Sequence, residues 1–403
     1  MVSWRKIRLG DICEIERGGS PRPIKDYITN RDDGVNWIKI GDTSSNSMYI
    51  TSTKEKIIPE GVSKSRFVKS GDFLLTNSMS FGRPYILKVD GCIHDGWLVI
   101  RDEKNFFNKQ FLYYLLSSDY MYSILKNMAV GGVVNNLNSQ MVRNLELNVP
   151  TIDIQNKIAV VLEKAQELID KRKAQIEALD ELVKSKFIEM FGEPSKNEKN
   201  WEVAEIGNYL NVLTDYHSNG SYESLRDNVT LLDTPDYALM VRTTDLENNN
   251  FEKDVKYIDE HAYNHLEKSK VFGGEIIINK IGSAGKVYLM PFLNRPISLA
   301  MNQFLLRFDE EKVNHIFLYN LLLTPYMKTK IKEKVRGAVT KTITKDAIRE
   351  IKIILPPIQI QREFVDFIKQ VDKLKFEMQK SLTQLEDNFN SLIQKAFKGE
   401  LFN

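Results

Sequence analysis

The feature that most constrains the fold of this chain is an internal repeat. The stretches 149–155 and 355–361 read VPTIDIQ and LPPIQIQ and lie 206 positions apart. The same order of matches continues toward the N-terminus with small changes in offset; the pairs include Arg101 with Arg307, Gly82-Arg83 with Gly285-Lys286, Asp42 with Asp245, and Trp4 with Trp201. A period of this length is far too long for a solenoid, so each copy is a domain with an appendage.

The appendage of each copy has the pattern of a long helix. Apolar side chains recur every seven residues in both copies, and neither Pro nor Gly interrupts them before Gly192 and Gly399. This heptad pattern predicts two helices of about 36–40 residues, roughly 55–60 Å long, that form a coiled coil. Equal stripes on one polypeptide favour antiparallel pairing within the chain over a homodimer seam or a spacer alone. The seam positions are Leu162, Ile169, Ile176, Val183, Ile368, Leu382 and Phe389.

The part of each copy before its helix mixes strand and helix patterns. Strands are predicted at 35–40, 72–76, 97–100, 275–278 and 304–307, and helical segments at 109–127 and 313–334. We therefore expect an α+β protein: two pseudo-repeated mixed α/β domains separated by two long helices that form an antiparallel coiled coil. The expected boundaries are 1–150 for the first domain, 151–195 for the first spacer helix, 196–355 for the second domain and 356–403 for the second spacer helix.

Composition narrows the class of protein. With 42% hydrophobic residues and 56 Lys+Arg against 54 Asp+Glu, the chain has the make-up of an ordinary globular protein. No run approaches the ~20 apolar residues that span a bilayer, and residues 1–6 lack the apolar core of a signal peptide. Cys13 and Cys92 are too few for a disulfide framework. We expect a cytoplasmic protein without membrane contact.

Signals of catalysis are weak throughout the sequence. In residues 282–286 (GSAGK) the glycine spacing is too short for a phosphate-binding loop, and Val287 stands where that loop has a Ser or Thr after the lysine. The Pro-Pro-aromatic loop with which adenine methyltransferases grip a flipped base is also missing. Two weaker patterns are a loose metal-nuclease set without an equivalent in the other copy (Asp236, Asp254 and Lys256) and a histidine pair without a third ligand (His261 and His265). We predict no catalytic residue, metal site or cofactor on this chain; a nuclease or methyltransferase is the enzymatic alternative.

Basic residues set among turns predict contact with nucleic acid. Lys and Arg neutralise phosphates, while Arg, Asn, Gln and Ser read base edges. Arg83 and Lys286 stand out because each follows a matched glycine at a turn that leaves a strand, and 131–136 and 337–342 are matched polar loops. The candidate DNA-binding residues are Arg17, Arg22, Lys25, Lys39 and Arg83 in the first copy, and Arg242, Lys280, Lys286, Arg336 and Lys341 in the second. A scaffold that joins proteins without DNA is the non-enzymatic alternative.

Two variable domains, each opening with a Trp six residues before Gly10 or Gly207 and each followed by a long helix, resemble the specificity (S) subunits of type I restriction–modification systems. The resemblance covers essentially the whole chain. It implies two target-recognition domains for a bipartite duplex DNA sequence, spaced by helices on which two methyltransferase (M) subunits dock, with the seam residues above as expected contacts. It also implies restriction (R) subunits in the full complex. Adenine-N6 methylation and DNA cleavage, with S-adenosylmethionine, ATP and Mg, would then belong to the partners.

Overall fold

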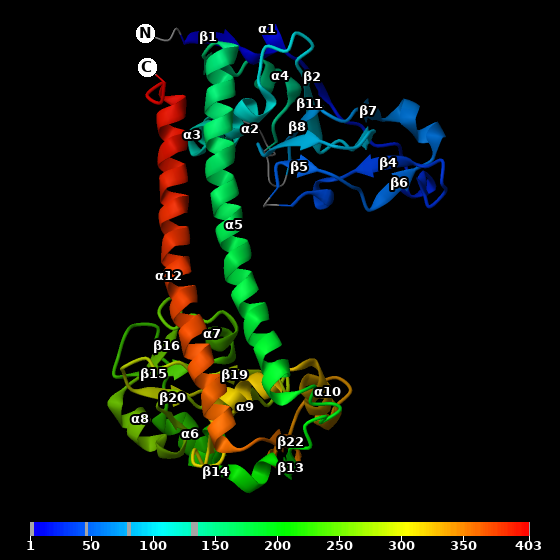
Figure 1. Ribbon diagram of the computed structural model, residues 1–403. Coiled ribbons are helices and arrows are strands. Elements are labelled where there is room, and N and C mark those ends of the chain that lie inside the picture. Colours follow the sequence, from blue (N-terminus) through cyan, green and yellow to red (C-terminus); the bar gives the residue numbers. More distant parts are fainter. Residues whose placement is uncertain (1–3, 45–46, 79–81, 130–135, 403) are drawn as a thin grey trace. The chain divides into compact units, whose positions relative to one another are not determined.

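The computed structural model describes residues 4–44, 47–78, 82–129 and 136–402 (Figure 1). Their contacts divide the chain into two compact units. Unit 1 comprises residues 1–175 and 378–403, and unit 2 comprises residues 176–377. Within the described residues no helix is long and apolar enough to cross a bilayer.

Unit 1 is built on two five-stranded sheets and a two-stranded ribbon. The first sheet has the order β2 (Glu14–Arg17), β11 (Trp97–Arg101), β8 (Phe73–Thr76), β9 (Pro84–Leu87) and β5 (Tyr49–Ile50). The second has the order β3 (Ile28–Thr29), β6 (Glu55–Ile57), β4 (Val35–Ile38), β10 (Gly91–Ile93) and β7 (Arg66–Val68). The ribbon pairs β1 (Arg5–Arg8) with β12 (Glu146–Val149), and the helices are α1 (Leu9–Ile12), α2 (Lys109–Ser117), α3 (Asp119–Ala129) and α4 (Ser139–Arg143).

Unit 2 repeats this plan with fewer strands. One sheet has the order β14 (Leu210–Asp215), β21 (Gln303–Phe308), β18 (Ile276–Asn279) and β19 (Val287–Leu289); the other has the order β16 (Lys256–Ile258), β15 (Ala238–Val241), β20 (Ile297–Leu299) and β17 (Lys270–Val271). The ribbon pairs β13 (Glu202–Glu205) with β22 (Lys352–Leu355). The helices are α6 (Tyr222–Asn228), α7 (Thr243–Glu247), α8 (Glu260–His265), α9 (His315–Leu322), α10 (Pro325–Lys334) and α11 (Lys345–Arg349).

Strand register shows that the two units share one framework. In each unit one sheet contains a single parallel pair among its named neighbours, β4 with β10 and β15 with β20, flanked by antiparallel strands. In the other sheet, Arg17 lies opposite Leu98 and Asp215 lies opposite Phe304. Because Leu98 and Phe304 hold equivalent positions beside β8 and β18, Arg17 and Asp215 occupy the same place in the two frameworks.

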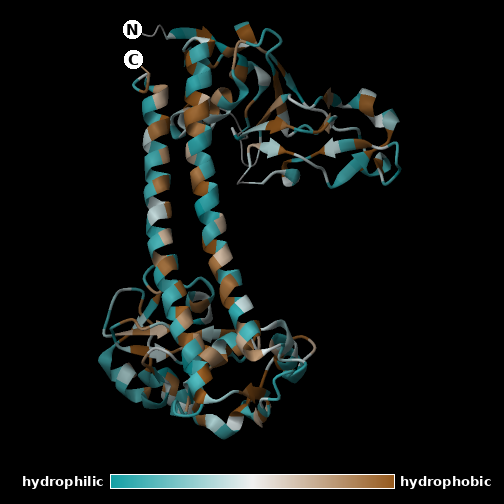
Figure 2. Cartoon of the chain, in the orientation of Figure 1, coloured by the Kyte–Doolittle hydropathy of each residue, from teal (hydrophilic) through white to brown (hydrophobic). Residues whose placement is uncertain are grey.

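The predicted long helices are present as α5 (Ile152–Phe191) and α12 (Ile358–Phe397), of 40 residues each. Hydrophobic residues recur turn after turn along both (Figure 2). In unit 1 the first half of α5 packs with the last half of α12: Leu162 and Phe389 belong to one hydrophobic cluster, and Lys173 pairs with Glu386 at 2.9 Å. In unit 2 the remaining halves pack, with Phe187 against Phe364. The pairing is antiparallel, as the heptads predict.

A buried glutamine fixes the start of each long helix. Gln361 Oε1 accepts a hydrogen bond from the Asn314 N–H at 2.9 Å, and its Nε2 donates to the carbonyls of Pro356 and Lys312 at 2.7 and 3.2 Å. Gln155 makes the equivalent bond to the Asn108 N–H at 2.9 Å. Each side chain thereby ties its helix to the loop that precedes α2 or α9.

The segments 109–127 and 313–334 are each two helices rather than one. Ser118 adopts an extended conformation between α2 and α3, and its Oγ accepts from the Met121 N–H at 3.3 Å. In unit 2 Thr324 caps α10, whose first residue is Pro325. Pro325 lacks an N–H and restricts the residue before it to extended backbone, so a helix ends there.

Candidate nucleic-acid interface

The β8–β9 and β18–β19 turns place Arg83 and Lys286 equivalently. The Thr76 N–H donates to the Arg83 carbonyl, and the Asn279 N–H donates to the Lys286 carbonyl, both at 3.0 Å. The glycine before each cation closes the turn with a hydrogen bond of 2.8 Å, and its φ of +76° (Gly82) or +84° (Gly285) is a conformation that favours glycine. The matched glycines therefore reflect a shared turn geometry.

The surroundings of these two cations differ. Arg83 is exposed, and the described part of the chain gives its guanidinium no hydrogen bond or ion pair. Lys286 pairs with Glu247 at 3.1 Å and lies over the Tyr288 ring. The hydrogen bond from Lys286 lowers the pKa of Glu247 and raises that of Lys286 itself. Arg83 is thus the more available cation of the pair.

In unit 2 the β18–β19 turn lies beside the loop 336–342. Ile281 forms a β-bridge with Thr342, and the Ile343 N–H donates to the Lys280 carbonyl at 3.1 Å. This arrangement brings together Lys280, Arg336 and Lys341, the last two of which are exposed. In unit 1 the Leu137 N–H makes the matching bond to the Asn77 carbonyl at 3.0 Å. Most of the matched loop predicted at 131–136 lies outside the described residues.

Asp215 anchors two lysines at this edge of unit 2. Its Oδ2 accepts from Lys280 at 3.0 Å, and its Oδ1 accepts from Lys345 at 3.1 Å and from Ser218 at 2.6 Å. The Asp215 side chain is 8% exposed, against 29% for Lys280 and 31% for Lys345. Burial raises the pKa of Asp215, but the hydrogen bonds from Ser218, Lys280 and Lys345 outweigh it and lower the pKa to about 2. The carboxylate is ionised at neutral pH.

Asp95 holds the corresponding cluster in unit 1. Ser20 Oγ donates to Asp95 Oδ1 at 3.0 Å, Arg22 pairs with Oδ2 at 3.6 Å, and Arg17 Nε donates to the Asp95 carbonyl at 3.0 Å. Burial raises the pKa of Asp95, but the Ser20 hydrogen bond and the nearby cations bring it below its ordinary value. Two predicted cations are therefore brought together at Asp95: Arg22 at its carboxylate and Arg17 at its backbone carbonyl.

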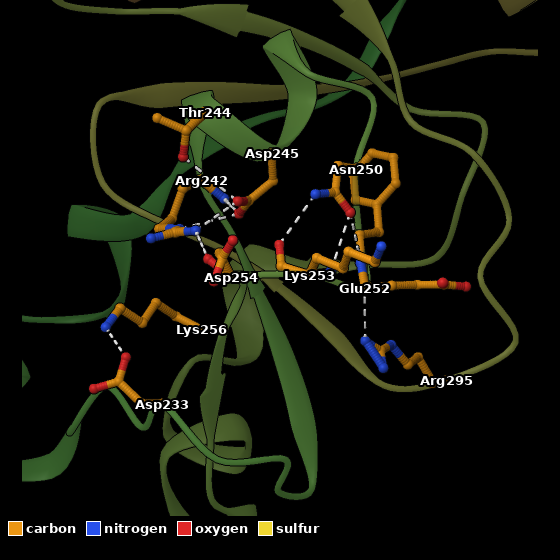
Figure 3. A network of polar contacts seen from close by, with 11 residues as sticks. Asp233, Arg242, Thr244, Asp245, Asn250, Glu252, Lys253, Asp254, Lys256 and Arg295 are labelled. Carbon is orange, nitrogen blue, oxygen red and sulfur yellow. Dashed lines mark hydrogen bonds and ion pairs between the residues drawn. The ribbon is translucent and has the colours of Figure 1, made fainter. Parts of the chain in front are cut away.

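Lys39 and Arg242, two further predicted cations, serve equivalent loop-capping sites. The Lys39 N–H donates to Asp42 and the Arg242 N–H donates to Asp245, both at 2.8 Å. The Arg242 guanidinium also binds Asp245 at 2.7 Å and the Asp254 carbonyl at 2.6 Å, a network visible in Figure 3. Lys39 Nζ pairs with Glu55 at 2.5 Å. Because these donors are engaged within the chain, their first role is to fold the loops.

The remaining residues singled out from the sequence are Lys25, Lys256, His261 and His265. Lys25 is exposed in a short 3-10 turn. Lys256 pairs with Asp233 (Figure 3) rather than with the nuclease-like acids, and His261 and His265 contact Asn228 and Ser224. Among the described residues no group of three potential ligands could hold a metal ion.

The seam residues of the long helices are buried or half-buried. Leu162, Ile169, Ile368 and Leu382 are buried, and Ile176, Val183 and Phe389 are half-buried. Because these side chains form the seam between the helices, contact with another subunit requires side chains on the outer faces. The exposed large apolar residues of α5 and α12 are Ile152, Val160, Leu168, Leu182, Ile188, Leu374 and Phe376. The sequence could have indicated these residues as candidate contacts, because they are apolar and lie outside the heptad seam.

Comparison with known proteins identifies the family. A family model for the type I restriction modification DNA specificity domain matches residues 1–178 and 198–387. The type I restriction enzyme MjaIX specificity subunit of Methanocaldococcus jannaschii is 26% identical over 425 residues, covering 99% of this chain and 93% of the relative. The EcoBI specificity subunit of Escherichia coli is 22% identical over 431 residues, covering 99% and 86%.

Two solved structures share the fold. One, from work on complex assembly and conformational transition of the type I R-M system, has a TM-score of 0.64 at 18% identity and covers 100% of both chains. The other, the type I restriction–modification S subunit from M. genitalium, has a TM-score of 0.53 at 16% identity and covers 98% of this chain and 96% of that one. Since the family model matches both copies of the repeat, the chain belongs to the family of type I restriction–modification DNA specificity proteins.

Proposed function

We propose that this chain is the sequence-specificity subunit of a type I restriction–modification complex and recognises a bipartite duplex DNA target. Residues 1–150 and 196–355 each recognise one part of the target, and the helical segments 151–195 and 356–403 separate them. The observation that carries the proposal is one repeated framework with different side chains at equivalent positions, such as Arg17 and Asp215 at the ends of β2 and β14. A shared scaffold with different loop residues suits two related sites with different targets.

The chain performs no catalysis of its own in this proposal. Two methyltransferase subunits dock on the outer faces of α5 and α12, where exposed apolar side chains such as Leu168 and Phe376 offer contact area. Restriction subunits complete the cytoplasmic complex. Adenine-N6 methylation and DNA cleavage then take place on the partners, which bind S-adenosylmethionine, ATP and Mg. This division of labour agrees with the lack of a recognisable catalytic motif in the sequence.

A binding experiment separates this function from its alternatives. The chain is purified with its methyltransferase subunit and titrated with a duplex that carries the motif methylated in cells, and with a scrambled duplex, at several salt concentrations. We expect tighter binding of the motif, with an affinity for both duplexes that falls as salt rises. Equal, salt-independent binding would instead favour a protein scaffold, and methylation or cleavage of DNA by the isolated chain would favour an enzyme.

A further inference from the structure

We propose that Asp215 is a positioning residue that holds the ammonium groups of Lys280 and Lys345 ready to bind acceptor atoms on base edges in one half of the DNA target. The assignment rests on the proposed function and adds to it the groups with which the second domain reads sequence. Asp215 ends β14, Lys280 follows β18, and Lys345 begins α11. One carboxylate thus fixes three separate elements at a single point.

The donors and acceptors of this cluster are unevenly available. Asp215 accepts from three side chains and is nearly buried, so its carboxylate has little left to offer a ligand. An ammonium group carries three donors. Lys280 donates one hydrogen bond to Asp215, and Lys345 donates one to Asp215 and one to Ser218. The partly exposed remainder consists of donors alone, which select acceptors such as O6 and N7 of guanine or O4 of thymine.

The carboxylate argues for base edges over phosphates. Attraction to phosphate depends on net positive charge, and Asp215 reduces the charge of the two-lysine cluster from +2 to +1. Restraint of two flexible side chains lowers the entropy cost of forming directed hydrogen bonds. A lysine pair that binds phosphate loses attraction through Asp215, whereas a pair that makes hydrogen bonds of defined geometry to base edges gains order from it.

Unit 1 contains a similar side-chain cluster built from different residues. Asp95 accepts from Ser20 and pairs with Arg22, and its carbonyl accepts from Arg17. The framework position of Arg17 is occupied in unit 2 by Asp215, so a cation of the first cluster stands where the second has its carboxylate. A serine, a carboxylate and two cations recur while their positions change, as expected if each cluster is adapted to its own half of the target.

The test compares Asp215→Asn with a matched control, Glu275→Gln. Glu275 is also nearly buried and pairs with Arg307 at 3.1 Å, but it stands at the other end of β18 from Lys280. Methylated motifs are mapped by sequencing DNA from cells that carry each variant with its methyltransferase subunit. We expect D215N to relax one or two positions in one half of the motif, and E275Q to leave the motif intact.

Titration of the purified complexes gives the second readout. For D215N we expect a tenfold to hundredfold loss of affinity for the cognate duplex and no loss for a duplex in which that half is scrambled. Lys345→Gln, which keeps the Asp215–Lys280 pair, should relax a subset of the same positions. Tighter binding of D215N to both duplexes with an intact motif would show phosphate contact and overturn the assignment; an intact motif in K345Q would do the same. A wild-type complex that does not discriminate would instead overturn the proposed function.

Discussion

At the scale of single residues, the charged side chains of the candidate interface fall into two groups. Lys39 and Arg242 have their donors engaged by neighbouring carboxylates that shape loops. Arg83 and Lys341 are exposed on turns. Exposed cations of the second kind are the ones able to neutralise DNA phosphates without first breaking an internal ion pair.

Replacement of the matched turn cations tests this distinction. If both contact phosphate, Arg83→Ala and Lys286→Ala should each weaken cognate and scrambled duplexes alike and reduce the log–log salt slope by roughly 0.9. The loss should be larger for Arg83, because Lys286 must give up its pair with Glu247 before it binds. Titrations at several salt concentrations measure both effects. Unchanged affinity in both variants would remove this turn from the DNA-binding surface.

Asp215 also predicts a pH dependence of stability. Its folded-state pKa of about 2 lies below the ordinary 3.8, so the ionised carboxylate stabilises the fold by about 2 kcal/mol above pH 4. That contribution is lost as pH falls from about 4 through 2, since the unfolded chain binds the proton first. The difference in unfolding free energy between wild type and Asp215→Asn, measured by denaturant titration, should therefore shrink over this range. A difference independent of pH would contradict the ion-pair explanation.

The sequence predicted the placement of single residues where the evidence lay in a local pattern. The equivalence of Arg83 and Lys286 could be predicted because each follows a glycine that the turn requires. The Asp215 cluster could not, because Lys280 and Lys345 are 65 and 130 positions away and only the tertiary fold brings them together. The capping roles of Lys39 and Arg242 were missed although Asp42 and Asp245 lie only three positions further along the chain. The DNA contacts of all these residues remain predictions.

At the scale of elements, periodicity specified the long helices and missed the breaks in shorter ones. A heptad pattern that neither Pro nor Gly interrupts predicted α5 and α12, of 40 residues each. The breaks at Ser118 and Pro325 were missed because apolar residues continue on both sides of them, although Pro325 was a local signal for a new helix. Strands were predicted within one or two residues where β-branched and aromatic residues cluster.

The buried glutamine at the start of α12 should stabilise unit 2. Gln361→Leu leaves the Asn314 N–H and the carbonyls of Lys312 and Pro356 without this partner. Unpaired buried polar groups are costly, so we expect the free energy of unfolding to fall by about 1–3 kcal/mol. Gln359→Leu is the matched control, because Gln359 lies on the same helix turn and is exposed. Equal stability of the two variants would show that the Gln361 hydrogen bonds contribute nothing measurable.

At the scale of the whole molecule, helix length should determine the spacing of the two parts of the DNA target. Four added residues lengthen a helix by about 6 Å, or about one to two base pairs of duplex. Because α5 and α12 pair antiparallel, matched insertions near Ala174 and after Glu377 preserve both the Lys173–Glu386 and the Asp180–Lys375 pairs. We expect the methylated motif of this variant to gain one or two unspecified base pairs. A folded variant with an unchanged gap would refute the role of the helices as a ruler.

The central claim is that each domain reads its own half of the target, and exchange of one domain tests it most directly. Residues 1–150 are replaced by those of another family member, and the methylated motif is mapped by sequencing DNA from cells that carry the chimaera with its methyltransferase subunit. The repeated framework, in which each unit has its own sheets and core, predicts a motif with one half changed and the other half and the gap retained. A motif changed in both halves would contradict independent reading by the two domains.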